Sequence, residues 1–276
     1  MTSSENILAD IRRFVVVGAG VMGGTILGAA LRAGLTPDRV AVAEHRASVR
    51  DHLAATLGVT TFGEAADVVA GADVVLLAIK PQHALETVRS LAGSVAPGAL
   101  VVSVVAGIGS ATLEGLLPPG TPVVRVMPNT PARVGAGASA ISAGSAASPD
   151  HLALVEALLS ATGLVVTVEE KQLDAVTGLS GSGPAYVLLI IEALADAGVR
   201  LGLTRDVAQR LAVQTVGGTA RLAAETGEHP ALLREAVTSP GGTTAAGLAA
   251  LEEGAVRAAV AAAVVASAER SATIGG

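Results

Sequence analysis

The sequence predicts an α/β protein with a doubly wound, mostly parallel sheet in its first part and an all-α second part. Short valine-rich runs alternate with helix-length segments up to about residue 168, as repeated βαβ units require. A glycine-rich turn directly follows the first of these runs. After Glu169 the strand pattern stops, and alanine- and leucine-rich helical sequence continues to the C-terminus. We therefore expect two domains, 1–168 and 169–276.

Five apolar runs in the first half are continuous and bounded by Gly, Pro or charged residues, which is typical of parallel strands buried on both faces. They lie at 14–20, 39–44, 73–81, 99–107 and 122–129. A later helix is expected to have Ser148 as its N-cap, Pro149 in its first turn and Gly163 at its end. One last strand is expected at 164–168.

Composition argues against several classes of function. The formal net charge is −6 and no basic stretch is present, so we expect no binding of nucleic acid. The chain has no cysteine, and its five histidines are scattered, so we expect no metal site. The longest apolar runs are too short for a membrane span of roughly 20 residues. The N-terminus lacks a secretory apolar stretch, and we expect a soluble, cytoplasmic protein.

The turn after the first strand has the pattern G-x-G-x-x-G as Gly18, Gly20 and Gly23. It follows a buried strand and opens an amphipathic helix, the context in which this pattern binds a dinucleotide. Gly18 permits the tight turn, Gly20 lets the backbone approach a pyrophosphate, and Gly23 lets helix and strand pack closely. The free N–H groups of the helix N-terminus would face the phosphates. The first domain is therefore predicted to be a Rossmann nucleotide-binding domain.

Other strand ends are expected at the same edge of the sheet, where ligands of such folds bind. Glu44 could accept hydrogen bonds from both ribose hydroxyls, which favours NAD, whereas Arg46, with His45, could pair with a 2′-phosphate, which favours NADP. Solvated charges at a strand end are the alternative. Lys80 ends the third strand and is expected to face the cofactor or simply to terminate the strand. Asn129 ends the fifth and is expected on the nicotinamide side.

Two glycine-rich loops are expected to interrupt the helical half, at 178–186 and 238–247. In the second, Gly241 and Gly242 are expected to adopt positive φ, and a helix to begin near Thr243. Converging backbone N–H groups would then form a small anion site suited to a carboxylate. The hydroxyls beside them belong to Ser239, Thr243 and Thr244. A helix N-terminus that binds nothing is the alternative.

The alanine-rich segment 255–268 carries little polar surface for a helix on a domain exterior. Small side chains permit close helix approach, so we expect this segment and its neighbours to pack against another subunit. Burial within a single chain is the alternative.

Several blocks together resemble the pyrroline-5-carboxylate reductase family. The segments 174–187 and 233–254 look like its two hallmark segments, and "GAGVMG", "AIKPQ", "VVAGI" and "VMPNTP" match its N-terminal blocks in the same order. The resemblance implies hydride transfer from NADPH, with NADH also accepted, to the C=N bond of 1-pyrroline-5-carboxylate, giving L-proline. It also implies that the helical domain makes a homodimer and that dimers assemble further into a decameric ring.

The resemblance also implies the site residues. The substrate-binding residues would be Ser239, Gly241, Gly242, Thr243 and Thr244. Thr244 would be the catalytic residue, hydrogen-bonded near the ring nitrogen. The cofactor-binding residues would be Gly18, Gly20, Val21, Met22, Gly23, Glu44, His45, Arg46, Ala78, Lys80, Pro81, Ala106 and Asn129. The sequence departs from the family pattern at Glu44 with its two neighbours, and at Ala65, where many relatives carry asparagine.

A protonated imine is already electrophilic, so the expected reaction needs placement of two reactants more than acid catalysis. This agrees with a sequence that has no Tyr-x-x-x-Lys motif, and Tyr186 is expected to pack between helices. One alternative is a related imine or β-hydroxyacid dehydrogenase; the latter needs a lysine after the glycine loop, whereas Lys171 precedes it. The other is a non-catalytic NADP-binding sensor, which would bind the cofactor without turnover.

Overall fold

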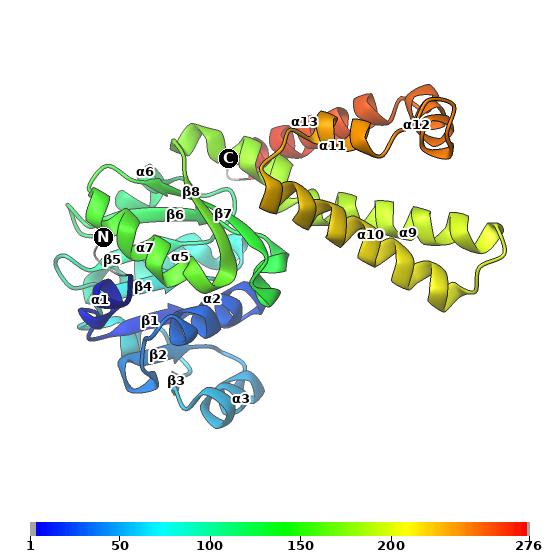
Figure 1. Ribbon diagram of the computed structural model, residues 1–276. Coiled ribbons are helices and arrows are strands. Elements are labelled where there is room, and N and C mark those ends of the chain that lie inside the picture. Colours follow the sequence, from blue (N-terminus) through cyan, green and yellow to red (C-terminus); the bar gives the residue numbers. More distant parts are fainter. Residues whose placement is uncertain (1–3, 275–276) are drawn as a thin grey trace. The chain divides into compact units, whose positions relative to one another are not determined.

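The computed structural model describes residues 4–274, which form two compact units (Figure 1). The first unit contains the chain up to Gly181 together with its end from Ala266, and the second contains Ser182–Val265. The boundaries of these compact units differ from the expected boundary at 168/169, because residues 170–181 and the last turns of the final helix pack with the first unit. The domain division at 168/169 stays a prediction.

The first unit is built on an eight-stranded sheet with the order β3-β2-β1-β4-β5-β6-β7-β8. The strands are β1 (Phe14–Val17), β2 (Val40–Ala43), β3 (Thr60–Phe62), β4 (Val74–Leu77), β5 (Leu100–Ser103), β6 (Val123–Met127), β7 (Gly137–Ala143) and β8 (Gly163–Thr167). All neighbours pair in parallel except β6 and β7. The doubly wound, mostly parallel sheet is confirmed. The strand order reverses beside β1, where ligands of such sheets bind.

Helices cover both faces of the sheet. They are α1 (Ser4–Ala9), α2 (Val21–Arg32), α3 (Ala47–Leu57), α4 (Ala66–Val69), α5 (Pro81–Leu91), α6 (Ser110–Glu114), α7 (Pro149–Leu159) and α8 (Leu173–Val176). Val16 and Leu76 pack into one core with α2 and α7, whereas Val15 and Val75 pack into a second core with α4, α5 and α6. Alternate residues of one strand therefore fill two cores, which explains why these strands read as continuous apolar runs.

Two strands were not expected from the sequence. β3 is a short edge strand, and β7 is made of Gly, Ala, Ser and a single Ile. Close packing explains the glycine at the start of β7, because a Cβ on Gly137 would lie 2.8 Å from both Ala132 and the Thr162 carbonyl oxygen. The helix beginning at Pro149 is confirmed, with Ser148 accepting a bond from the His151 N–H. It ends at Leu159, before a 3-10 turn that leads to Gly163.

The second unit consists of helices and, within its described residues, no strand. They are α9 (Gly183–Arg200), α10 (Arg205–Thr226), α11 (Pro230–Ala236), α12 (Thr243–Glu253) and the first part of α13 (Val256–Ile274). α9 and α10 pack through Ala195, Ala208 and Ala212. The Tyr186 hydroxyl donates to the Ala263 carbonyl at 3.2 Å, so this tyrosine joins α9 to α13.

The expectation of a glycine-rich loop at 178–186 is wrong. The chain instead continues from α8 through a π-helical turn, Thr177–Gly181, toward α9. None of the glycines in this stretch has a positive φ. Pro184 lies in the first turn of α9, where a missing N–H costs nothing. At Gly181 the close neighbour is the Met127 methyl group, the end of a flexible side chain that would have to move to admit a Cβ.

Candidate functional site

A cavity of about 710 Å³, called here the nucleotide pocket, opens at the carboxyl ends of β1, β2 and β4. Its lining residues are Gly18, Gly20, Val21, Glu44, His45, Arg46, Ala78, Ile79, Lys80, His83 and Thr87. Eight of the thirteen cofactor residues implied by the sequence lie there together. The pocket occupies the position beside β1 where the strand order reverses.

The other five do not line this pocket: Met22, Gly23, Pro81, Ala106 and Asn129. For these five residues, and for the eight that line the pocket, contact with a cofactor stays a prediction. Sequence reasoning missed Ile79, His83 and Thr87. The spacing of His83 and Thr87, three and seven residues after Lys80, was the available signal, because it places them on one face of the helix that follows β4.

The glycines of the first turn have distinct geometries. Gly18 has φ +91°, and a Cβ on it would lie 2.6 Å from the Ala78 carbonyl oxygen. A Cβ on Gly23 would collide with the Gly18 carbonyl group, so α2 can approach β1 closely only with glycine there. Gly20 faces open space and is the N-cap of α2, without a side-chain cap. The turn therefore leaves the first N–H groups of α2 available to an anion.

Glu44 is the most constrained side chain of the nucleotide pocket, with 2% of its side chain exposed. Its Oε1 accepts hydrogen bonds from the backbone N–H of Arg46 at 3.0 Å and from Arg46 Nε at 2.9 Å. Its Oε2 accepts from Arg46 Nη2 at 3.0 Å and from the Ala19 N–H at 3.0 Å. The Arg46 side-chain bonds outweigh desolvation and lower the pKa of Glu44 to about 2.

The backbone around Glu44 is fixed by a second arginine. Arg50 Nη1, from α3, donates to the carbonyl oxygens of Glu44 at 2.7 Å and His45 at 3.0 Å. The His45 ring lies 3.1 Å from Glu44 Oε1 but is 84% exposed. The turn from β2 to α3 is thus held by its own side chains, while Arg46 stays 49% exposed.

Asn129 is buried just after β6, and both the nitrogen and the oxygen of its side-chain amide make hydrogen bonds to the backbone. Nδ2 donates to the Ser180 carbonyl at 3.1 Å, and Oδ1 accepts from the Ala138 N–H at 2.8 Å. These bonds join the end of β6 to β7 and to the π-helical turn. The predicted role of Asn129 on the nicotinamide side has to be compatible with both contacts.

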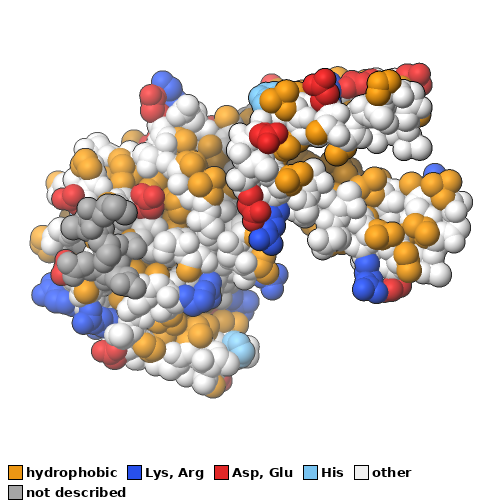
Figure 2. Space-filling view, in the orientation of Figure 1, with side chains coloured by type: hydrophobic (Ala, Val, Ile, Leu, Met, Phe, Trp, Pro, Cys, Tyr) orange, Lys and Arg blue, Asp and Glu red, His pale blue; other side chains and the backbone are white. Residues whose placement is uncertain are grey.

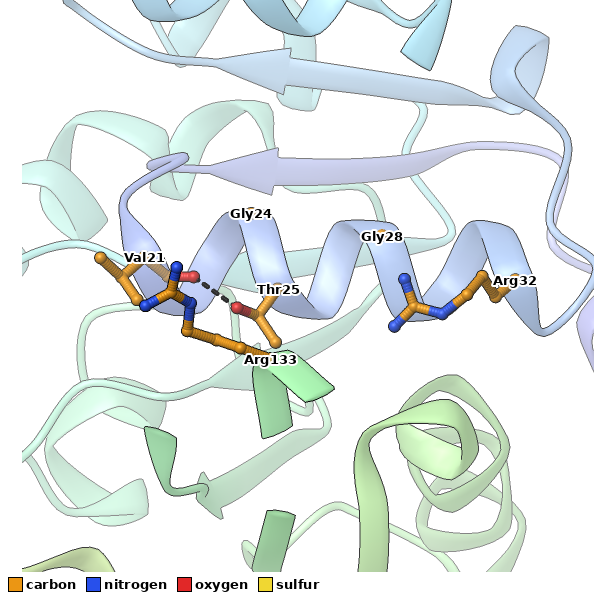
Figure 3. Close-up of a pocket in the computed structure, with 6 residues that line it drawn as sticks. All are labelled: Val21, Gly24, Thr25, Gly28, Arg32 and Arg133. Carbon is orange, nitrogen blue, oxygen red and sulfur yellow. Dashed lines mark hydrogen bonds between the residues drawn. The ribbon is translucent and has the colours of Figure 1, made fainter. Parts of the chain in front are cut away.

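A second cavity of about 320 Å³ lies along α2 (Figure 3). It is lined by Val21, Gly24, Thr25, Gly28, Arg32 and Arg133. Val21 lines both cavities, so the second one adjoins the first turn of α2. Thr25 Oγ1 donates back to the Val21 carbonyl at 2.7 Å. Among the described residues, Arg133 has neither an ion pair nor a hydrogen-bond partner.

The predicted substrate turn, Ser239–Thr244, leads into α12, and its last two residues form the start of this helix, which begins at Thr243 as expected. Gly241 has φ +66°, but Gly242 has φ −80°, so the expectation of positive φ is wrong for Gly242. A Cβ at 242 would collide with Ser239 Oγ and lie 3.1 Å from the Ser239 carbonyl oxygen, so a larger residue would have to displace the Ser239 hydroxyl. The Gly242 N–H donates to the Ser239 carbonyl at 3.0 Å and closes the turn. A carboxylate bound by this N–H would compete with that bond.

The N-terminus of α12 has no side-chain cap. The first N–H groups of a helix have no intrahelical acceptor, and here they belong to Thr243, Thr244 and Ala245. The turn can therefore present N–H donors and hydroxyl groups to a small anion, as expected for a carboxylate site.

Two family models match the chain. Residues 170–274 match the model described as pyrroline-5-carboxylate reductase dimerisation, and residues 13–107 match the model described as NADP oxidoreductase coenzyme F420-dependent. The two matches fall on the helical half and on the nucleotide-binding half, which agrees with the predicted order of domains.

Individual relatives align over nearly the whole chain. The pyrroline-5-carboxylate reductase of Synechocystis sp. is 48% identical over 94% of this chain and 97% of its own. That of Arabidopsis thaliana is 44% identical over 92% of each. The solved structure of a Coxiella burnetii pyrroline-5-carboxylate reductase has a TM-score of 0.90 at 36% identity, covering 95% of this chain and 98% of the other. The Plasmodium falciparum pyrroline carboxylate reductase, solved with NADP bound, has a TM-score of 0.86 at 27% identity, covering 97% and 99%. The chain therefore belongs to the pyrroline-5-carboxylate reductase family.

Proposed function

We propose that this chain transfers a hydride from NAD(P)H to the C=N carbon of 1-pyrroline-5-carboxylate and releases L-proline, the last step of proline biosynthesis. The observation that carries the proposal is the presence, in one chain, of a nucleotide pocket at a glycine-rich turn and of the Ser239–Thr244 turn before α12. The reductases of Synechocystis and Arabidopsis, which align over 94% and 92% of the chain, support it.

The residues of the nucleotide pocket fit a nicotinamide dinucleotide. The uncapped N-terminus of α2 and the open space at Gly20 suit a pyrophosphate, and Lys80 and Arg46 add positive charge to the same pocket. The bound cofactor supplies the hydride. The part of this chain is to hold the cofactor so that its reactive face meets the substrate at near-attack distance.

We assign the substrate carboxylate to the Ser239–Thr244 turn. The positive end of α12, an 11-residue helix, and its uncapped N–H groups favour an anion there. The Ser239 hydroxyl is exposed at the same turn, and we place the Thr244 hydroxyl near the ring nitrogen. Orientation by these groups is enough for an iminium substrate that is already electrophilic.

We also propose that the helical half forms a homodimer and that dimers assemble into a decameric ring in the cytoplasm. Large apolar side chains cover α9 and α10, and Figure 2 shows them as orange patches on the surface of these helices. One stretch, 170–200, is long and apolar enough to cross a membrane by length and composition alone, so the expectation that every apolar run is too short for a span is wrong. The match to a dimerisation model over 170–274 supports a partner subunit as the cover for this surface.

The direct test is oxidation of NADPH and of NADH by the purified protein, followed by absorbance with and without 1-pyrroline-5-carboxylate. Substrate-dependent oxidation, with L-proline identified as the product, is the expected result. Cofactor binding without oxidation would instead favour a non-catalytic NADP-binding sensor. The mass in solution should be an even multiple of the 27.0 kDa protomer.

A further inference from the structure

We propose that Glu44 is a positioning residue and not the ribose-binding acid: it orients Arg46 for the 2′-phosphate of NADPH, and Arg46 in return keeps the carboxylate away from the ribose of NADH. This inference rests on the proposed use of NAD(P)H. It names which of the two cofactors the pocket selects, and it assigns the selection to a residue pair.

The first argument is the occupancy of the Glu44 carboxylate. An acid that binds the adenosine ribose must direct lone pairs into the pocket toward two hydroxyl groups. Both oxygens of Glu44 already accept from Arg46, and Oε2 also accepts from the Ala19 N–H. With 2% of the side chain exposed, little of this carboxylate can be reached from the cavity. A ribose could be bound by Glu44 only after Arg46 had left.

The second argument is the orientation of Arg46. Nε and Nη2 hold Glu44 in a bidentate pair, which fixes the plane of the guanidinium. Nη1 makes no hydrogen bond or ion pair among the described residues, and the side chain is 49% exposed in a pocket that also contains Lys80. A pre-oriented guanidinium with free donors is suited to a phosphate, and less ordering is needed when the phosphate binds.

The third argument is the bond from the Ala19 N–H to Glu44 Oε2 at 3.0 Å. Ala19 lies between the first two glycines of the turn that is expected to bind the pyrophosphate. One carboxylate therefore holds both the pyrophosphate turn and the Arg46 turn. A carboxylate that makes these contacts cannot bind the ribose hydroxyls at the same time.

The test is the affinity for NADP⁺ and for NAD⁺, measured by calorimetry on the full-length protein. The wild type should bind NADP⁺ more tightly. In Arg46→Gln the affinity for NADP⁺ should fall about tenfold or more, and the affinity for NAD⁺ should rise several-fold because Glu44 is released toward the ribose. If Arg46 bound only the phosphate, NAD⁺ affinity would stay unchanged, and that result would overturn the proposal.

Two further variants separate the roles. Glu44→Gln should weaken NADP⁺ binding, since Arg46 loses its charged anchor. It should leave NAD⁺ binding nearly unchanged, since the amide oxygen can still accept from the Ala19 N–H of the pyrophosphate turn. A large loss of NAD⁺ affinity in Glu44→Gln would show a ribose-binding acid and refute the inference. The double variant Glu44→Gln/Arg46→Gln should lose the gain in NAD⁺ affinity that Arg46→Gln shows.

The chain offers a matched control in Arg12, which pairs with Asp73 at 2.8 Å outside the nucleotide pocket. Arg12→Gln should leave the ratio of the two affinities unchanged. Thermal unfolding of each variant shows whether it is folded. Arg46→Lys keeps the charge without the bidentate contact and should have an intermediate ratio of the two affinities.

A wild type that binds neither nucleotide would contradict the proposed function itself. A wild type that prefers NAD⁺ while reducing the imine would contradict only this inference.

Discussion

Arg125 on β6 and Glu170, just before α8, form an ion pair of 2.7 Å between Nη1 and Oε1. The Ser110 N–H donates to the same carboxylate oxygen at 2.7 Å, so Glu170 joins β6, α6 and the start of the 170–181 stretch. Desolvation tends to raise the pKa of Glu170, but the bonds from Ser110 and the charge of Arg125 together keep it below its ordinary value.

Glu170→Gln should lower the free energy of unfolding by about 1–3 kcal/mol at neutral pH, because it removes a partner of Arg125. The pKa of Glu170 is depressed in the folded state. The contribution is therefore complete above the ordinary glutamate pKa and is lost as pH falls through the lower folded value. Urea unfolding at decreasing pH should show the wild type losing this advantage, whereas Glu225→Gln, from an exposed pair with Arg221, should change little.

Thr244→Ala should reduce kcat by about tenfold or more while the Kd for NADPH changes little, because we propose that this hydroxyl lies near the ring nitrogen of the substrate. Steady-state kinetics and calorimetry together give the two values. Thr238→Ala is the control, since that neighbouring hydroxyl already donates to the Arg234 carbonyl at 2.6 Å. An equal loss of turnover and cofactor affinity in Thr244→Ala would contradict the assigned role.

Gly241→Val should impair the enzyme more than Thr244→Ala. The φ of +66° at Gly241 costs a residue with a Cβ about 1–2 kcal/mol, and more when the side chain is β-branched, so the turn should open. KM for the imine is expected to rise and kcat to fall, with the melting temperature lowered by a few degrees. Gly247→Ala within α12 meets no atom within 4 Å and should be neutral or slightly stabilising.

Arg133→Gln should raise KM for NADPH several-fold and make it less sensitive to salt. Its free guanidinium lines the cavity beside Val21, in the first turn of α2, where a pyrophosphate is expected. Arg32 lines the same cavity, but its Cα lies in the last turn of this helix, roughly 16 Å further along the axis, and its guanidinium reaches back to Gly28. Arg32→Gln should therefore have the smaller effect, and equal effects would argue against a contact with the pyrophosphate.

Leu189→Glu should weaken the proposed dimer. Leu189 lies on α9 with 66% of its surface exposed in the single chain, and a charge placed in an apolar subunit interface is costly. Light scattering over a dilution series should show monomer at concentrations where the wild type is dimeric or larger. Leu251→Glu, at 52% exposure on α12, tests whether the apolar surface of that helix is covered as well.

Much of the nucleotide-binding half was predictable, because strands buried on both faces give valine-rich runs that few other structures produce. β7 gave no such signal, because its glycine, alanine and serine residues do not form a valine-rich run. Glycine at 137 is set in part by the close approach of Thr162, which is distant in the sequence. The loop at 178–186 was misjudged for a related reason. Glycine there relieves contact with Met127 and does not supply a positive φ.

The site shows the same limit. The sequence indicated Glu44 and Arg46 as cofactor residues and left two cofactors open, because spacing alone cannot say whether an acid and a base two residues apart bind a ligand or each other. Their pairing depends on the course of the chain after β2, which Arg50 fixes from α3. The place of His83 and Thr87 in the pocket could be predicted only by first predicting that α5 begins at Pro81.

The last turns of α13 belong to the first compact unit, where the Ser271 hydroxyl donates to Asp174 Oδ1 at 2.7 Å. The chain therefore leaves the first unit after Gly181 and returns to it at Ala266. A protein truncated after residue 181 would lack the returning segment and leave Asp174 without this donor. The first unit is thus completed by a segment that follows the whole helical unit in the sequence, and we expect its full stability only after that segment has been synthesised.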